Sequence, residues 1–511
     1  MIVLYTIFTI SFAIFLYYKF IYNNIWKKSN VPHPRPLPIF GNFKDYILLR
    51  KYGPQITQEI CQKFPDEPYV GVYYGTDPAL IIQDPNIIKL VMQKDFYYFN
   101  QREISKHTHK ELITQNMFFS GGDSWKVLRQ NMTTLFTSAK IKNMFYLIEN
   151  CAKSLENVLA NEVKTQNNIE VKSLLARYTM DCIGSCAFGI NTGTLERNSE
   201  SNPFFVVGYK IFDSTISGGF RIVARAMWPA YFYSLGFKLF QNEIITFFKT
   251  IMTGVFKARQ YEISTRNDFV DLFLAWKKNK HLVGDSITNM KTDIKSTVEL
   301  EIDDALLISQ CVMLYAAGYE TTSTTISLLL FELAKDEKAQ ARVIEEVDSY
   351  FQRHNRKIEF ECINEMPFLQ ACIEETLRLY PVLGTLTREV EEEYTLPTGL
   401  RLDKGLRVHI PVYHLHHDPK YFPEPEKFRP ERFYGDEKKN IKPFTYMPFG
   451  EGPRICIGQR FAKMPMIAGV LTIFRSYNVK LDDNMPTKVT FEPKSLVTQP
   501  LGGIHLNFMP R

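Results

Sequence analysis

The distribution of apolar residues predicts a mainly helical protein with a small amount of sheet. After residue 41, apolar residues recur every three or four positions over long stretches, the pattern of helices with one face in a core. The stretches expected to be helical are 52–64, 84–94, 140–163, 171–185, 236–259, 303–334 and 336–351. Short runs rich in β-branched and aromatic residues predict strands at 69–74, 78–83 and 405–411. The polar segment at about 277–300 is expected to be a surface linker.

Residues 1–22 form the most apolar stretch of the chain, with Lys19 as their only charge. About 18–20 apolar residues can cross a bilayer as a helix, which predicts a transmembrane signal anchor. A cleaved signal peptide fits less well, because there is no positively charged start and no small-residue cleavage site. Lys19, Lys27 and Lys28 follow the apolar stretch, so the positive-inside rule predicts that the remainder of the chain faces the cytosol.

Residues 23–41 are predicted to be a linker that ends in a stiff hinge. Four prolines alternate with other residues between positions 32 and 38, and alternating prolines favour an extended chain. The remaining residues, 42–511, contain no internal repeat and are expected to form one large folded domain.

The composition narrows the classes of function. The 511 residues are 45% hydrophobic and 14% aromatic, enough for a large core, and the net charge of +6 is too small to indicate nucleic-acid binding. The eight cysteines are scattered without paired spacings, which favours a reducing compartment over a disulfide framework.

One cysteine lies in an unusual setting, the sequence PFGEGPRICIGQRFA at 448–462. Gly450 and Gly452 allow backbone conformations that a side chain would disfavour, and Gly458 leaves room for a flat group to approach. Arg454 and the start of the helix expected after Cys456 should both lower the pKa of the thiol and favour the metal-binding thiolate. A lone thiolate argues against zinc or iron–sulfur ligation, which needs several ligands.

The spacing of Phe449, Gly452, Arg454, Cys456 and Gly458 resembles the haem-binding loop of the cytochrome P-450 superfamily. The resemblance implies haem b (iron protoporphyrin IX) with an axial thiolate from Cys456. It places further residues of the loop and of a long helix against the haem, namely Phe449, Gly450, Gly458 and Ala317.

The sequence AAGYETTSTT lies near the middle of the longest predicted helix. Gly318 weakens a helix, and threonine hydroxyls can bond to backbone carbonyls, so a locally opened helix that holds water beside Thr321 is expected. Glu320 and Thr321 then offer an acid and an alcohol for proton transfer. The segment resembles the oxygen-activation motif of the family, which implies that both residues are catalytic.

The resemblance also implies contacts to the two haem propionates. Trp125 and Arg129 stand four apart on one helical face and can present an indole N–H and a guanidinium group. The other expected contacts are Arg454, Arg388 and, with a weaker match, Arg102. A further set, Glu375, Arg378 and Arg432, resembles the ion-pair network beneath the haem loop and is expected to be structural.

These matches cover most of the chain and are similar to the microsomal group of the family, which includes insect detoxification and vertebrate drug-metabolising enzymes. They imply a mainly α fold with small sheets, and a monooxygenase that uses O2 and NADPH–cytochrome P-450 reductase, with cytochrome b5 as an optional second donor. The expected location is the endoplasmic reticulum membrane, with residues 42–511 as a cytosolic catalytic domain. The expected substrate is a lipophilic small molecule, and apolar residues suggested for its pocket are Phe118, Phe119, Phe204, Phe205, Leu383 and Leu386.

Three alternatives stay open from the sequence. One is an enzyme of the same fold that rearranges or dehydrates peroxides without a reductase. Another is a non-catalytic haem-thiolate carrier or sensor, and the third is a haem-free protein in which Cys456 is structural. One departure from the family pattern is Pro465, two turns into the helix after Cys456, where a kink costing about 3 kcal/mol is expected.

Overall fold

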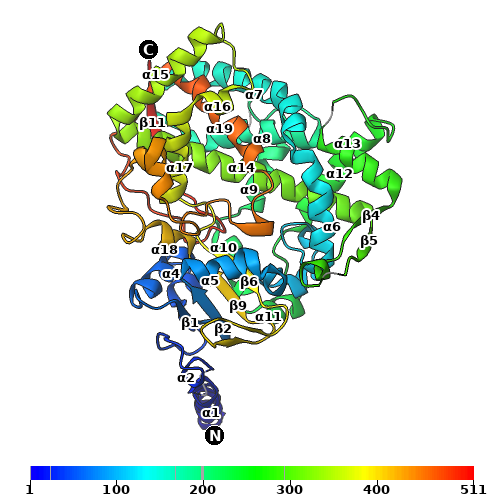
Figure 1. The fold of residues 1–511 in the computed structure, drawn as a ribbon, viewed down its shortest axis with the longest axis vertical. Coiled ribbons are helices and arrows are strands. Elements are labelled where there is room, and N and C mark those ends of the chain that lie inside the picture. Colours follow the sequence, from blue (N-terminus) through cyan, green and yellow to red (C-terminus); the bar gives the residue numbers. More distant parts are fainter. Residues whose placement is uncertain (1, 23–24, 167, 197–200, 267, 293) are drawn as a thin grey trace.

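The computed structural model of the chain describes residues 2–22, 25–166, 168–196, 201–266, 268–292 and 294–511. Helices make up most of the molecule and the largest sheet lies at one end, next to the N-terminal helix (Figure 1). The predicted fold class, mainly α with small sheets, is therefore confirmed.

The long predicted helices are present with boundaries close to those expected. The principal helices of the body are α4 (Gly53–Gln62), α6 (Gly122–Thr133), α7 (Ser138–Thr165), α8 (Val171–Ile183), α12 (Asn242–Ala258), α14 (Asp304–Lys335), α15 (Glu337–Arg353), α17 (Pro367–Leu379) and α19 (Gln459–Phe474). The others include α1 (Ile2–Tyr22), α2 (Ile25–Lys28), α3 (Lys44–Ile47), α5 (Pro85–Lys89), α9 (Pro203–Ile211), α10 (Ile216–Met227), α11 (Pro229–Ser234), α13 (Phe269–Asn279), α16 (Cys362–Glu365) and α18 (Val412–His416). The stretch 84–94 is divided between α5 and a π-helical turn, Leu90–Lys94.

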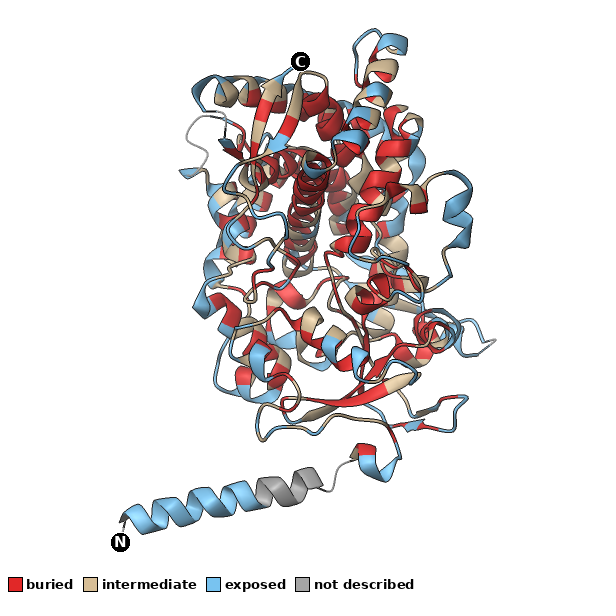
Figure 2. Cartoon of the chain, turned by 90° about the vertical axis from the view of Figure 1, so that its left-hand side faces the viewer, coloured by how far each residue is buried: buried red, intermediate tan, exposed pale blue. Residues whose placement is uncertain are grey.

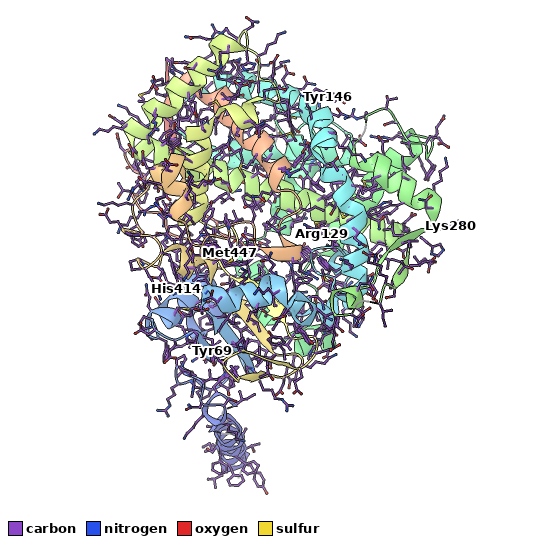
Figure 3. The ribbon with its side chains drawn as sticks, viewed as in Figure 1. Tyr69, Arg129, Tyr146, Lys280, His414 and Met447 are labelled. Atoms are coloured by element: carbon purple, nitrogen blue, oxygen red, sulfur yellow. The ribbon has the colours of Figure 1, made fainter. Side chains whose placement is uncertain are left out.

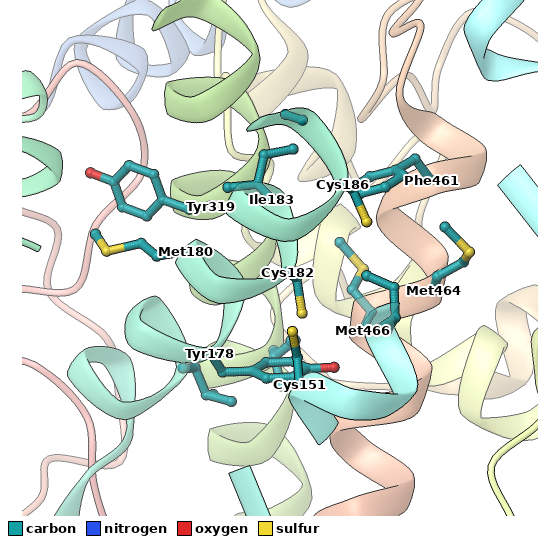
Figure 4. Close-up of a cluster of buried hydrophobic side chains, with 14 of the residues drawn as sticks. Cys151, Tyr178, Met180, Cys182, Ile183, Cys186, Tyr319, Phe461, Met464 and Met466 are labelled. Carbon is teal, nitrogen blue, oxygen red and sulfur yellow. The ribbon is translucent and has the colours of Figure 1, made fainter. Parts of the chain in front are cut away.

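Helix α14 forms the centre of the core and is buried along most of its length (Figure 2). Its main neighbour is α8, and the two approach closely at Gly318, where a Cβ atom would lie 2.7 Å from the Ile183 side chain. Beside this contact, side chains of α7, α8, α14 and α19 fill one apolar cluster that includes Tyr178, Cys182, Tyr319 and Met464 (Figure 4).

The largest sheet has the order β1 (Tyr69–Tyr74), β2 (Asp77–Ile82), β9 (Arg407–Ile410) and β6 (Leu386–Glu389). Strands β2 and β9 are parallel, and the other two pairs are antiparallel. A three-stranded sheet joins β10 (Tyr477–Leu481), β11 (His505–Pro510) and β3 (Asn168–Glu170), and a two-stranded ribbon joins β7 (Tyr394–Thr395) and β8 (Arg401–Leu402). The predicted strands 69–74, 78–83 and 405–411 are thus confirmed.

The expectation of a surface linker at 277–300 was wrong. This segment contains an antiparallel hairpin of β4 (His281–Asp285) and β5 (Thr297–Glu301). Leu282 pairs with Leu300 and both pack on the main core, while the residues between them in sequence are mostly exposed. Leu282 on β4 with Val298 and Leu300 on β5 is too weak a signal to distinguish a hairpin from a polar linker by periodicity.

The N-terminal helix α1 stands away from the body, and its described side chains from Val3 to Phe15 are exposed (Figure 2). Within the part of the chain that the structure describes, no helix has both the length and the apolar character needed to cross a membrane. Residues 1 and 23–24, which belong to the predicted anchor and linker, lie outside the described residues, as do the side chains of 16–22.

Pro465 lies inside α19, which continues without interruption from Gln459 to Phe474. The hydroxyl of Tyr178 donates to the carbonyl of Pro465 at 3.1 Å, which adds a tertiary hydrogen bond at this position. Helix α19 therefore accommodates Pro465 in its interior. The turn that contains Cys456 lies before this helix and outside the turns next to the proline.

A fully buried ion pair supports the turn that precedes Cys456. Arg378 donates two hydrogen bonds of 2.8 Å to Glu375, and Arg432 Nε lies 3.5 Å from the same carboxylate, as the sequence predicted. Arg378 also donates to the carbonyl of His416, whose Nε2 accepts a hydrogen bond from the backbone N–H of Met447 at 2.9 Å. The pair is thereby connected to residues 447–458, which we call the cysteine loop.

We expect Glu375→Gln to destabilise the protein by roughly 3–5 kcal/mol, because it leaves the buried Arg378 charge without its partner. Glu424→Gln is the matched control, since Glu424 forms an exposed i, i+3 pair with Lys427 that should be worth less than about 1 kcal/mol. The thermal midpoints of both variants measure the effect. Equal midpoints would show that the Glu375–Arg378 pair does not support the fold.

Candidate active site

The cysteine loop depends on two glycines in left-handed conformations. Gly450 and Gly452 have φ values of 76° and 70°. A Cβ atom on Gly452 would lie 1.8 Å from the carbonyl oxygen of Met92, so no other residue fits there without moving the backbone. The backbone N–H of Cys456 donates to the carbonyl of Phe449 at 2.9 Å and closes the loop. Gly458 caps the N-terminus of α19, and a Cβ atom there would make only an ordinary contact, 3.8 Å from Phe136.

Of the eight cysteines, all of them in the described part of the chain, Cys456 alone is exposed. Burial among surrounding protein nevertheless raises the pKa of its thiol, and the Gly458 N–H, Arg129 and Arg102 oppose that effect. The Cys456 side chain has accessible surface although protein surrounds it, so it faces a space inside the molecule.

The expectation that Arg454 lowers the thiol pKa was wrong. The guanidinium of Arg454 is directed at the carbonyls of Phe118 and Ser120, while Arg129 and Arg102 are the arginines that favour the thiolate.

Four arginines gather around Cys456 without acidic partners among the described residues. They come from separate parts of the fold: Arg102 before α6, Arg129 on α6, Arg388 on β6 and Arg454 in the cysteine loop. The Nε atoms of Arg102, Arg388 and Arg454 are buried and donate no hydrogen bond. We call these four residues the arginine cluster.

Burial lowers the pKa of every member of the arginine cluster, and repulsion from other members adds to the shift for Arg102, Arg388 and Arg454. The pKa of Arg388 falls to about 9 and that of Arg102 to about 10, and the pKa of Arg454 falls well below its usual value. For Arg129, burial lowers the pKa and the Cys456 thiolate opposes the shift. Buried positive charges without negative partners are unfavourable, so we expect an anion to bind beside these four arginines.

Aromatic rings hold the guanidinium groups in place. The guanidinium of Arg454 lies 4.8 Å from the ring centre of Trp125, and that of Arg102 lies 3.8 Å from the ring centre of Phe118. Figure 3 shows Arg129 and Met447 in the middle of the molecule, on α6 and at the start of the cysteine loop. The structure thus brings Trp125, Arg129, Arg388, Arg102 and Arg454 to one site, as the sequence predicted.

The residues present fit a haem. Its two propionates supply the anionic charge that the arginine cluster lacks, Cys456 supplies one thiolate, and Gly458 leaves space for a flat ring. When bound, the iron would favour the thiolate form of Cys456, because a coordinating thiol is deprotonated.

Helix α14 has one accessible stretch near the middle of its otherwise mostly buried length. Ala317 is exposed and Thr321, one turn later, is half-buried, although almost all residues from Tyr319 to Leu333 are buried. The hydroxyl of Thr321 donates to the carbonyl of Ala317 at 2.7 Å. The predicted opening of the helix is absent here: α14 is continuous, and Gly318 instead permits the close contact with α8.

Glu320 lies on a different side of α14 from Ala317 and Thr321. Its carboxylate is buried, pairs with Lys172 at 2.9 Å and accepts a hydrogen bond of 2.7 Å from the side chain of Gln499. The sequence offered no signal for Lys172 or Gln499, because each is more than a hundred residues from Glu320 and belongs to no recognisable motif.

The apolar residues suggested for a substrate pocket are divided by the structure. Phe118 and Phe119 are half-buried and pack edge to face, with ring centres 4.9 Å apart, beside the arginine cluster. Phe204 instead packs in the core against Phe247 and Tyr315, and Phe205 packs on Tyr209. Leu386 is buried in β6, while Leu383 is partly buried.

Comparison with known proteins agrees with this site. Residues 31–507 match the family model of cytochrome P450. Similar proteins include cytochrome P450 6B7 of Helicoverpa armigera (33% identical, 98% of this chain and 96% of the relative) and cytochrome P450 6k1 of Blattella germanica (36%, 98% and 95%). Cytochrome P450 6B4 of Papilio glaucus is 35% identical, with 99% of both chains covered.

The chain belongs to the cytochrome P450 family. It is a haem enzyme of the monooxygenase class, and a cysteine thiolate is the axial ligand of its iron. The relatives above are insect proteins, consistent with the insect detoxification type.

We expect Gly452→Ala to abolish haem incorporation, because its Cβ would collide with the Met92 carbonyl and displace the cysteine loop. Gly399→Ala is the control: its φ is also positive, at 86°, but no atom lies within 4 Å of the added methyl group. The control should therefore carry only the backbone cost of about 1–2 kcal/mol. Haem absorbance per mole of protein is the measurement, and equal loading of both variants would contradict the role given to Gly452.

Proposed function

We propose that the protein inserts one atom of O2 into lipophilic small molecules, xenobiotics or endogenous lipids and hormones, with electrons from NADPH supplied through a reductase. The observation that carries this proposal is the accessible Ala317–Thr321 face of the otherwise buried helix α14. Its Thr321 hydroxyl group belongs to the segment that resembles the oxygen-activation motif of the family, and we therefore place it on the substrate side of the haem held by Cys456 and the arginine cluster.

Each residue has a separable part in this reaction. Cys456 donates electron density as a thiolate, the arginine cluster and Trp125 bind and orient the propionates, and Thr321 donates a proton on the substrate side. When bound, the haem supplies the activation of O2 and the oxidation itself. Glu320 is held by Lys172, so it can pass a proton toward Thr321 only after its carboxylate rotates away from that lysine.

Two alternatives remain as outcomes of experiment. An isomerase or dehydratase acting on peroxides would need no proton delivery for O2, and the accessible hydroxyl of Thr321 weighs against it. A non-catalytic haem-thiolate carrier or sensor would consume no NADPH. Incubation with purified NADPH–cytochrome P-450 reductase, NADPH and a panel of lipophilic compounds separates the three, with Cys456→Ser as the inactive control. Product that requires both NADPH and O2 supports the monooxygenase.

The electron donor, NADPH–cytochrome P-450 reductase with cytochrome b5 as an optional second donor, is expected to dock on the side of the cysteine loop. A cavity of about 210 Å³ on that side is lined by Glu374, Glu451, Gln459 and Lys463, among others. Of the lysines that precede the loop, Lys438 pairs with Glu374 and Lys439 with Asp436, so part of their charge is neutralised within the chain. Lys463 and Arg460 are the remaining cations closest in sequence to Cys456.

We further propose that residues 1–22 anchor the protein in the endoplasmic reticulum membrane, with the catalytic domain in the cytosol. The exposed apolar side chains of α1 support this, because such a surface is unfavourable in water. Further exposed apolar residues occur on α10 and α11, which lie toward the same end of the molecule as α1 (Figure 1). They are Ile216, Phe220, Tyr231 and, just after α11, Leu235.

Thr321→Ala should retain haem and substrate binding but lower the product formed per NADPH, by roughly 10²-fold or more if proton delivery limits the reaction. Thr325→Ala is a close control, because its hydroxyl also donates to the carbonyl four residues earlier, at 2.8 Å, but is buried. Product and NADPH are measured in the same assay. Unchanged coupling in Thr321→Ala would remove this residue from the mechanism.

Deletion of residues 1–22 should release the protein from carbonate-washed microsomes while leaving haem content unchanged. The reason is that α1 makes up the anchor, whereas the haem residues lie in the body of the protein. Immunoblots of the carbonate supernatant and pellet give the distribution. A truncated protein that stays in the pellet would mean that α10 and α11, or another segment, anchor the chain.

A further inference from the structure

Arg225 on α10 is a buried arginine outside the arginine cluster, and it forms no ion pair with a described carboxylate, although its charge contributes to lowering the pKa of Glu103. Its side chain is only 7% exposed. The Nε atom donates to the hydroxyl of Tyr233 on α11 at 2.6 Å, whereas the Nη2 atom is buried and has no hydrogen-bond partner. Leaving a buried guanidinium group partly unsatisfied is costly, so a partner for Nη2 is expected from outside the chain.

The carboxylates nearest to Arg225 are already engaged. Glu103 accepts a hydrogen bond from Arg407 at 3.1 Å and contacts His409 at 2.8 Å. Glu111 accepts hydrogen bonds from the backbone N–H groups of Leu239 and Phe240. Neither forms an ion pair with Arg225, and no other described carboxylate does so.

His107 presents a second unused polar atom beside Arg225. Its Nε2 atom is buried without a partner, and its ring stacks on Tyr233 with ring centres 5.4 Å apart. Burial and the charges of Lys106 and Arg225 lower the pKa of His107 to about 4, so its ring is neutral near pH 7. A neutral imidazole can donate one N–H without repelling the neighbouring guanidinium.

An aromatic path connects these two residues with the haem site. The guanidinium of Arg225 lies 5.3 Å from the ring centre of Phe119, which packs on Phe118. Phe118 in turn carries the guanidinium of Arg102, a member of the arginine cluster. The side chains that connect Arg225 with the arginine cluster are therefore two phenylalanines, so this path is apolar between two cationic ends.

We propose that Arg225 and His107 form the binding site for the carboxylate of the substrate. The substrate class is a lipophilic carboxylic acid whose hydrocarbon part lies along Phe119 and Phe118 and whose far end reaches the haem. This inference rests on the proposed monooxygenase function, because it assigns the substrate class of the same site. A carboxylate supplies two acceptor atoms, one for the guanidinium and one for the imidazole N–H.

The competing role for Arg225 is structural, in which its hydrogen bond to Tyr233 only fastens α10 to α11. Tyr233→Phe removes that hydrogen bond but keeps the ring under His107 and the charge of Arg225. If Arg225 binds the substrate, Tyr233→Phe should retain the preference for an acid. If Arg225 is only structural, its own replacement should affect all ligands alike.

The test uses full-length, haem-loaded protein in discs of phosphatidylcholine, so that the added acid is the only free carboxylate among the ligands. Dodecanoic acid and methyl dodecanoate are titrated at pH 7.4, and the dissociation constant of each is read from the haem spectrum. The wild type should bind the acid more tightly than the ester. Arg225→Met should weaken binding of the acid roughly 10- to 100-fold and leave the ester unchanged.

Two variants give the comparison its controls. Arg221→Met removes an arginine from the same helix whose guanidinium donates to Ser217 at the surface, and it should leave both constants unchanged. His107→Phe keeps a ring on Tyr233 but loses the N–H, and should weaken the acid selectively, by roughly tenfold. If Arg225→Met does not fold, His107→Phe and Arg225→Lys, which keeps the charge and should keep part of the preference, decide the question.

A wild type without preference for the acid, or variants that weaken the acid and the ester equally, would overturn this assignment. Failure of the proposed monooxygenase function can be distinguished from failure of the carboxylate site, because the binding titrations involve no reductase, NADPH or turnover. The protein could bind dodecanoic acid through Arg225 and yet form no NADPH-dependent product. That result would support the carboxylate site and contradict only the proposed monooxygenase function.

Discussion

The feature on which the active site depends is a concentration of positive charge that the protein does not neutralise itself. Arg102, Arg129, Arg388 and Arg454 converge beside Cys456 from four separate segments, and burial lowers the pKa of each of them. Such an arrangement is unfavourable in the protein alone and becomes favourable with a dianionic porphyrin. Cofactor binding and completion of the fold are therefore coupled in this region, as for other ligands that bind only the native state.

The rest of the structure holds this unfavourable arrangement in place. The Glu375–Arg378 pair is neutral overall and fully hydrogen bonded, and through His416 it fixes the backbone of Met447. On the other side of the cysteine loop, the carbonyl of Met92 leaves room only for Gly452. The loop is thus positioned by two contacts that are far apart in sequence, and neither of them involves the thiol.

The sequence predicted what depends on nearby residues and missed what depends on distant ones. The glycines, arginine and thiol of the cysteine loop fall within ten residues, and the long helices have strong periodicity, so both were found. The β4–β5 hairpin was taken for a linker because only Leu282, Val298 and Leu300 mark its inner face. Gly318 was read as a point of weakness, whereas its role is set by Ile183 on another helix, and the partner of Glu320, Lys172, could not be found without the fold.

The same electrostatic reasoning applies twice in this molecule, at two ends of one apolar path. At the inner end, the arginine cluster is matched by a cofactor that every member of the family binds, which is why its residues could be recognised from the sequence. At the outer end, Arg225 and His107 belong to no shared motif, and what distinguishes each from a surface residue is one buried nitrogen atom without a hydrogen-bond partner. A buried guanidinium group that forms no ion pair destabilises the fold unless a ligand uses it, and this cost is the basis for proposing a ligand at Arg225, between Phe119 and Tyr233. The cofactor site thus identifies the class of reaction, and the proposed second cationic site would select the molecules that react there.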